Sequence, residues 1–150
     1  MKSILILAGA VVLGLIGWRL AGGDGASGAG PTADLATATA AEPGAAMVAV
    51  TLPASLSSEA QIGKLGFDGI CAECHGENAA GRQDMGPPLV HIYYEPSHHA
   101  DMAFQLAVQN GVRAHHWSFG DMPPQEGLTR ADVAAITTYV RELQRANGID

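Results

Sequence analysis

The chain has 150 residues and a formal net charge of −7, and 47% of its residues are hydrophobic but only 5% are aromatic. This length allows one modest domain with shorter flanking segments, and the scarcity of aromatic side chains predicts a small core. Eight Lys and Arg residues against fifteen Asp and Glu residues argue against a nucleic-acid-binding protein, which needs a basic face.

The N-terminal segment is apolar and carries an export or membrane signal. An uncharged run extends from Ile4 to Trp18 and is followed by Arg19. It is longer than many signal-peptide cores and shorter than the roughly 20 residues of a full span, so its length leaves both interpretations open. An indole and a guanidinium at its end are typical of a membrane interface. We therefore expect residues 1–20 to be a retained anchor, with a cleaved signal sequence as the alternative.

Residues 21–53 consist mainly of Gly, Ala, Thr, Ser and Pro, with scattered acidic side chains. Such a composition buries too little apolar surface to offset the entropy of the chain. We predict a flexible linker that lets the following domain, residues 54–150, reach neighbouring membrane proteins. A processing region that is removed is the alternative.

The domain opens with a helical pattern that begins at residues 57–59. It carries Ile62, Leu65 and Phe67 and is interrupted by Gly63. Glycine is unfavourable inside a helix by about 1 kcal/mol relative to alanine, and close approach of a second helix is one physical reason to have it. The pattern thus predicts a helix crossing at Gly63.

Both cysteines of the chain lie in the next stretch, Cys71-Ala72-Glu73-Cys74-His75. The spacing C-x-x-C-H is typical of c-type haem attachment, in which two thiols form thioethers with the haem vinyl groups and the histidine binds iron. A dithiol redox pair does not need the histidine, and a closed zinc site needs four ligands, whereas the chain has no second cysteine pair. We predict one covalently attached haem c, which would fill the centre of the small core.

Two further helices are expected beyond this motif. One covers about residues 101–110 and ends at Gly111, where a left-handed cap belongs. The other begins after Thr129, with Asp132 as its reciprocal capping partner, and continues to Ala146. Apolar residues recur at helical spacing along the last helix: Val133, Ile136, Tyr139, Val140 and Leu143. No strand of convincing alternation is present.

From Ser57 to the C-terminus, the order of these features resembles a class I monohaem cytochrome c. The shared features are an opening helix with glycine and an aromatic residue, C-x-x-C-H, Gly-Pro-x-Leu at residues 86–89, a short helix, a Met-Pro loop and a long closing helix. The resemblance implies a small all-α fold in which the opening and closing helices cross around the haem. It also implies that Gly63 and Phe67 face the closing helix, with Tyr139 as the aromatic partner.

The resemblance implies a role for each residue of the haem site. Cys71 and Cys74 would be the thioether anchors and His75 the proximal iron ligand. The carbonyl of Pro87 would accept a hydrogen bond from the imidazole of His75 and orient the ring. Met122 would be the distal ligand.

The distal assignment has competitors within the same domain. Met85 and Met102 are also candidates, but Met122 lies in a loop and is followed by two prolines, which would hold its thioether in place. Histidine ligation of the iron stays open, because five histidines remain besides His75. They also permit a second metal site, since imidazole suits copper and zinc: His91, His98, His99, His115 and His116. The sequence assigns no role to Trp117.

One-electron transfer is the function that the resemblance implies. Two axial ligands leave no open position on the iron, and the sequence contains no recognisable catalytic constellation, so we do not expect an enzyme. The expected partners are redox proteins of a respiratory or related chain. Alternatives are a haem-based ligand-binding module, a histidine-rich copper-handling module, or a dedicated electron-entry subunit.

The expected location follows from the N-terminal segment and from the route of haem attachment. We predict the bacterial inner membrane, with the haem domain in the periplasm, or a soluble periplasmic protein if residues 1–20 are cleaved. Residues 54–150 hold six Lys and Arg against twelve Asp and Glu, so the domain would present a mainly negative surface to its partners.

Overall fold

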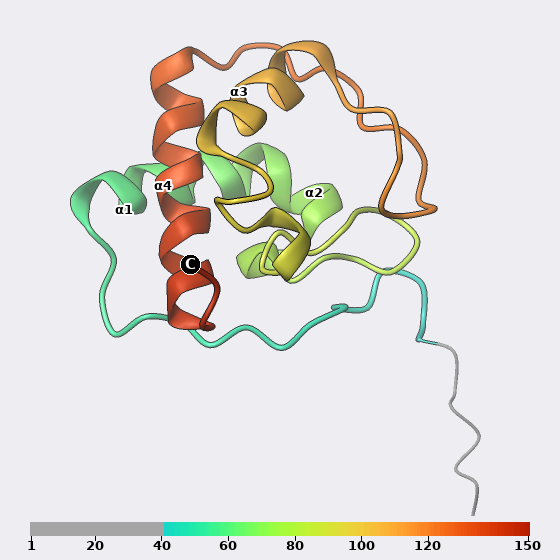
Figure 1. The fold of residues 1–150 in the computed structure, drawn as a ribbon, viewed down its shortest axis with the longest axis horizontal. Helices are drawn as coiled ribbons and strands as arrows, with labels where there is room; N and C mark the ends of the chain where they lie inside the picture. Colours follow the sequence, from blue (N-terminus) through green and yellow to red (C-terminus); the bar gives the residue numbers. More distant parts are fainter. Residues whose placement is uncertain (1–40) are drawn as a thin grey trace, which may run out of the picture. The chain divides into compact units, whose positions relative to one another are not determined.

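The computed structural model describes residues 41–150, which form a small helical domain (Figure 1). Its main helices are α1 (Ser58–Gly66), α2 (Ala72–His75), α3 (Asp101–Asn110) and α4 (Arg130–Ala146). A short π-helical segment (Phe67–Cys71) joins α1 to α2, and two 3₁₀ turns cover Glu77–Ala79 and Ile92–Tyr94. Within residues 41–150 the chain forms isolated bridges but no β-strand, so the predicted all-α fold is confirmed.

The predicted anchor, residues 1–20, and the linker up to residue 40 lie outside the described residues. None of the helices within residues 41–150 is long and apolar enough to cross a bilayer.

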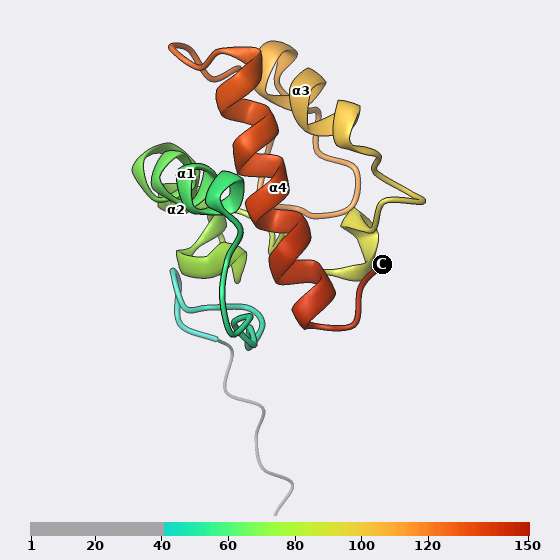
Figure 2. The same cartoon turned by 90° about the vertical axis from the view of Figure 1, so that its left-hand side faces the viewer.

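Helices α1 and α4 cross, and the core lies at their crossing (Figure 2). The rings of Phe67 and Tyr139 meet edge to face, with centroids 5.5 Å apart, and both side chains are fully buried. This contact confirms the aromatic pair that the family resemblance implied. All five apolar residues predicted for the inner face of α4 are buried.

The helix ends follow from local hydrogen bonding. Ser57 caps α1 by accepting a hydrogen bond from the backbone N–H of Ala60 at 3.1 Å. At the start of α4, the Thr129 hydroxyl accepts from the N–H of Asp132, and the Asp132 carboxylate accepts from the N–H of Thr129. These reciprocal bonds satisfy two donors that a helix N-terminus leaves unpaired. The predicted capping residues of α4 are therefore confirmed.

The structure differs from the sequence prediction at the start of the domain. Residues 44–51 are hydrogen-bonded to it: the Gly44 N–H donates to the Gln83 carbonyl at 2.8 Å, and the Met47 N–H donates to the Ala80 carbonyl at 3.1 Å. Thr51 pairs through both its N–H and its carbonyl with the side chain of Asn147. The predicted boundary at residue 54 thus falls beyond a segment that already belongs to the domain, which is held by backbone hydrogen bonds and by Val50, packed against the core.

Candidate functional site

An apolar cavity of about 440 Å³ opens beside the segment Phe67–Cys71, helices α2, α3 and α4, and the loop that precedes α4. Pockets of this size are typical of sites for organic ligands and cofactors. Four of the residues selected from the sequence line it: Cys71, Cys74, His75 and Met122. Pro87 lines it as well, so the fold brings all five predicted site residues to one cavity.

The two cysteines are free thiols at the mouth of the cavity. Cys71 is half-buried and Cys74 is exposed. Burial raises the pKa of the Cys71 thiol to about 11, with the neighbouring Cys74 adding to the shift. A dithiol redox centre requires a low-pKa thiolate, so this environment argues against that alternative.

His75 is fixed by a single hydrogen bond. Its Nδ1 lies 2.9 Å from the carbonyl oxygen of Pro87, which can only accept, so Nδ1 carries the proton and Nε2 keeps a free lone pair. Burial lowers the pKa of His75, while the bond to Pro87 opposes the shift. The imidazole is therefore neutral and oriented, which is the state that a metal ligand needs.

A glycine allows the Pro87 carbonyl to reach this imidazole. Gly86 packs on the backbone of α2, where a Cβ would stand 2.5 Å from the Cys74 carbonyl oxygen. Only a residue without a side chain fits there, so the Gly-Pro pair can lie directly against the C-x-x-C-H segment.

Met122 approaches the same cavity from the loop before α4. Its N–H and its carbonyl both pair with Val112, each at 2.9 Å, which closes the intervening residues into a loop. Gly111, with φ of +71°, permits the close approach, because a Cβ there would lie 2.5 Å from the Met122 carbonyl oxygen. The bridge and the two following prolines hold the backbone of Met122 rigidly beside the cavity.

Trp117 supplies an observation that points to a polar ligand group. Among residues 41–150, its Nε1 is the buried side-chain nitrogen or oxygen that lacks a hydrogen-bond partner of good geometry, and the residue lines the cavity. Its nearest acceptor is the Tyr94 hydroxyl, where Trp117 opposes the rise that burial causes in the pKa of Tyr94. A buried donor without an acceptor is costly and uncommon in proteins. A haem carries two carboxylates beside its apolar ring, so the apolar walls, the neutral imidazole, the two thiols and this donor all fit a c-type haem.

Trp117 could not be recognised from the sequence, since an unpartnered nitrogen is visible only once the loop is folded. Arg141 and Gln144 were not predicted either, although the sequence carries a signal for them. Both are buried on the inner face of α4, beside the apolar residues that the helical pattern selected. The signal is that these two polar residues, three positions apart, lie on a helix face that is expected to be apolar.

Of the other histidines, three line the cavity: His99, His115 and His116. The structure brings the ligand atoms of His98, His99 and His116 within 4.8 Å of one another, whereas His91 and His115 lie outside this trio. Desolvation lowers the pKa values of His99 and His116, and the charges of neighbouring imidazoles lower them further. Both side chains are thus neutral at neutral pH.

The sequence model of the family described as Cytochrome c matches residues 60–144. The chain belongs to the cytochrome c family. No curated protein matches it significantly. Membership implies a covalently bound haem c and a role in haem-based electron transfer with redox partner proteins, which agrees with the fit of the cavity residues to that group.

Proposed function

We propose that this cytochrome c is a six-coordinate one-electron carrier in which His75 and Met122 bind the haem iron. The observation that supports this assignment is that a neutral, oriented imidazole and a backbone-anchored methionine line one apolar cavity. Cys71 and Cys74 would form the thioethers. The Pro87 carbonyl would hold the proximal ring in one orientation by accepting a hydrogen bond from the Nδ1–H group.

When bound, the haem supplies an iron that cycles between Fe(III) and Fe(II). The chain's own residues determine what that iron can do. His75 and Met122 would hold the iron through an imidazole and a thioether, so we expect electron transfer without substrate chemistry. The apolar walls would exclude water from the haem and, together with the methionine, would favour the reduced state.

We further propose that the domain works outside the bacterial cytoplasm, on a membrane anchor formed by residues 1–20. The support is the apolar N-terminal run and the chemistry of haem attachment, which resembles a route completed in the periplasm. The acidic excess of the domain would steer it towards partners with positive surface patches. A soluble periplasmic form is the alternative if the segment is cleaved.

The axial assignment is tested by Met122→Ala in the haem-loaded protein. We expect loss of the weak far-red absorption band typical of methionine bound to ferric haem, and a fall in reduction potential on the order of 0.1 V. Met85→Ala is the matched control, because Met85 also lines the cavity but lies beside the proximal loop.

Two outcomes would contradict the assignment. If Met122→Ala keeps the band and the potential, the sixth ligand lies elsewhere. If the wild type lacks the band and its low-spin spectrum changes in His115→Ala or His116→Ala, a histidine binds the iron. An iron that binds carbon monoxide rapidly in the wild type would instead favour the ligand-sensing alternative.

A further inference from the structure

We propose that His98, His99 and His116 form a second metal site that binds one copper or zinc ion at the rim of the haem cavity. Their ligand atoms lie within 4.8 Å of one another although the residues come from two different loops. Neutral imidazole is the side chain that both ions accept most readily, and three of them leave a fourth position for water. This site is separate from the electron-transfer function proposed above, since none of the three is assigned to the haem.

The tautomer of His99 suits this role. Its Nδ1 faces the carbonyl oxygen of Tyr93, which can only accept a hydrogen bond, so the proton is on Nδ1 and Nε2 is free. Metal-binding histidines usually donate their second nitrogen to a carbonyl or carboxylate in this way. Tyr93 also stacks on His116, with ring centroids 4.8 Å apart and planes at 26°. One residue therefore orients two of the three imidazoles.

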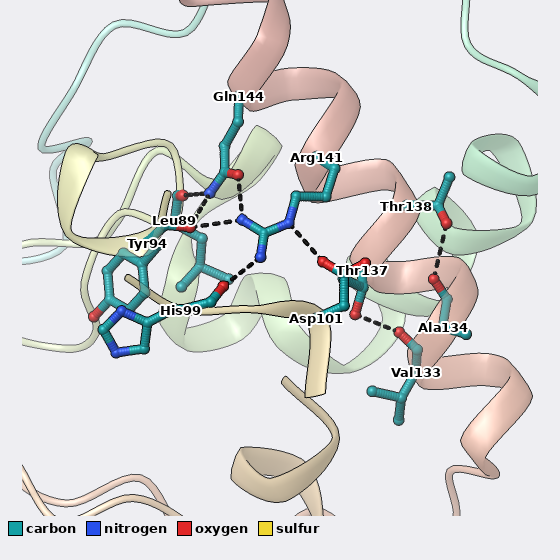
Figure 3. Close-up of polar contacts among 10 residues, drawn as sticks. All are labelled: Leu89, Tyr94, His99, Asp101, Val133, Ala134, Thr137, Thr138, Arg141 and Gln144. Atoms are coloured by element: carbon teal, nitrogen blue, oxygen red, sulfur yellow. Dashed lines mark hydrogen bonds and ion pairs between the residues drawn. The ribbon is translucent and has the colours of Figure 1, made fainter. Parts of the chain in front are cut away.

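The loop that carries His98 and His99 is held by a buried arginine of α4 (Figure 3). The guanidinium of Arg141 donates to the carbonyl of His99, to the carbonyl of Tyr94 at 2.7 Å and to the Asp101 carboxylate at 2.8 Å. The backbone N–H groups of both histidines also donate to the Glu95 carbonyl. This side of the site is thus rigid before any ion binds.

The loop that carries His116 is closed independently. The bridge between Val112 and Met122 joins its ends, and the Asp121 carboxylate accepts a hydrogen bond from the N–H of Ala114 at 2.8 Å. The two preformed loops bring together residues that are 17 or more positions apart in the sequence. An ion at the trio would tie one loop to the other.

The spacing needs only a small adjustment. Zinc–nitrogen bonds of 2.0–2.1 Å in a tetrahedron require nitrogens about 3.3 Å apart. The ligand atoms, which now lie within 4.8 Å of one another, must therefore approach by about 1.5 Å or less. His98 is exposed, and its side chain can make most of this movement without disturbing the core. His91 is a poor fourth candidate, because its Nδ1 already accepts the N–H of Tyr93 and its Nε2 therefore carries the proton.

The test is metal binding to the full haem-loaded chain without a polyhistidine tag. Equilibrium dialysis against Zn(II), and separately Cu(II), followed by metal analysis gives the stoichiometry and affinity, and the electron paramagnetic resonance spectrum of Cu(II) gives the number of nitrogen ligands. We expect one ion per chain and three nitrogens. His99→Ala and His116→Ala should each weaken binding by about tenfold or more.

His91→Ala is the matched control, since His91 meets the ring of Tyr93 edge to face but is not one of the ligands. It should bind the ion as the wild type does. The absorption spectrum of the haem should be unchanged in all three variants, which separates failure of this site from failure of the axial assignment. The proposal is overturned if the wild type binds no stoichiometric ion or if His116→Ala keeps full metal affinity. It is also overturned if His91→Ala loses as much metal affinity as His99→Ala and His116→Ala do.

Discussion

Gly63 of α1 lies directly on the backbone of Ala135 in α4, and a Cβ on Gly63 would stand 1.9 Å from the Ala135 carbonyl oxygen. This distance is far inside van der Waals contact, and a backbone carbonyl cannot rotate away as a side chain can. The crossing of the two helices, and with it the position of the C-x-x-C-H segment that follows α1, therefore depends on the missing side chain.

We expect Gly63→Ala to lower the free energy of unfolding by about 3 kcal/mol or more, because the helices must separate to admit a methyl group. Denaturant unfolding of the haem-loaded protein measures the change. Gly69→Ala is the matched control: nothing lies within 4 Å of a Cβ there, so it should be neutral or stabilising by up to about 1 kcal/mol. Equal effects in both variants would show that helix propensity, not the crossing, determines the result.

The unpartnered Nε1 of Trp117 gives a second prediction. If this N–H donates to a haem carboxylate, Trp117→Phe should lower the unfolding free energy by about 1–2 kcal/mol and lower the reduction potential, because a less compensated negative charge favours Fe(III). Redox titration and denaturant unfolding test both. Phe119→Leu is the control, since Phe119 stacks on Trp117 at 5.7 Å and alters packing without removing a donor. An unchanged potential in Trp117→Phe would contradict the assignment of this donor.

The helices and the haem motif were predictable from the sequence because each depends on local signals. The capping box at Thr129, the cap at Gly111 and the apolar spacing along α4 are all encoded within a few residues. The C-x-x-C-H segment likewise carries its chemistry in five consecutive residues. Even the crossing at Gly63 was predicted, because glycine is unfavourable inside a helix and close approach of a second helix explains its presence there.

What the sequence could not give depends on distant backbone contacts. The spacing of His98 and His116 along the chain permitted a metal site but did not require one, since the path of the chain after Gly111 is determined by the bridge at Val112 and Met122. The segment at 44–51 has the composition of a linker. It joins the domain through backbone hydrogen bonds, which composition does not reveal, and through the partly buried side chain of Val50.

Asn147 offers a direct test of that N-terminal segment. Its amide accepts from the N–H of Thr51 at 2.8 Å and donates to the Thr51 carbonyl at 2.9 Å. We expect Asn147→Ala to lower the unfolding free energy by about 1–2 kcal/mol and to speed hydrogen exchange at Thr51. Asn147→Asp keeps the acceptor and loses the donor, so its unfolding free energy should lie between those of the wild type and Asn147→Ala. Unchanged exchange in Asn147→Ala would mean that other bonds fix the segment.

Arg141 provides the last prediction, because it links the core of α4 to the loop of the proposed metal site (Figure 3). Asp101 is 73% exposed, so Arg141→Met strands no buried charge, and the ion pair itself contributes little. The loss comes from acceptors left without donors, the part-buried His99 carbonyl and the buried Gln144 Oε1, and we expect about 2–3 kcal/mol in unfolding free energy. Metal affinity should also fall by about tenfold, because His99 loses its anchor.

Arg145→Met is the control for Arg141→Met, since it removes an exposed guanidinium from the same helix. It should change stability by less than about 0.5 kcal/mol and leave metal affinity intact. The two readouts separate a structural role from a positioning role. If Arg141→Met loses stability but binds Zn(II) and Cu(II) as the wild type does, then Arg141 stabilises the domain without orienting His99, and the rigidity of the trio must come from the Glu95 and Tyr93 carbonyls instead.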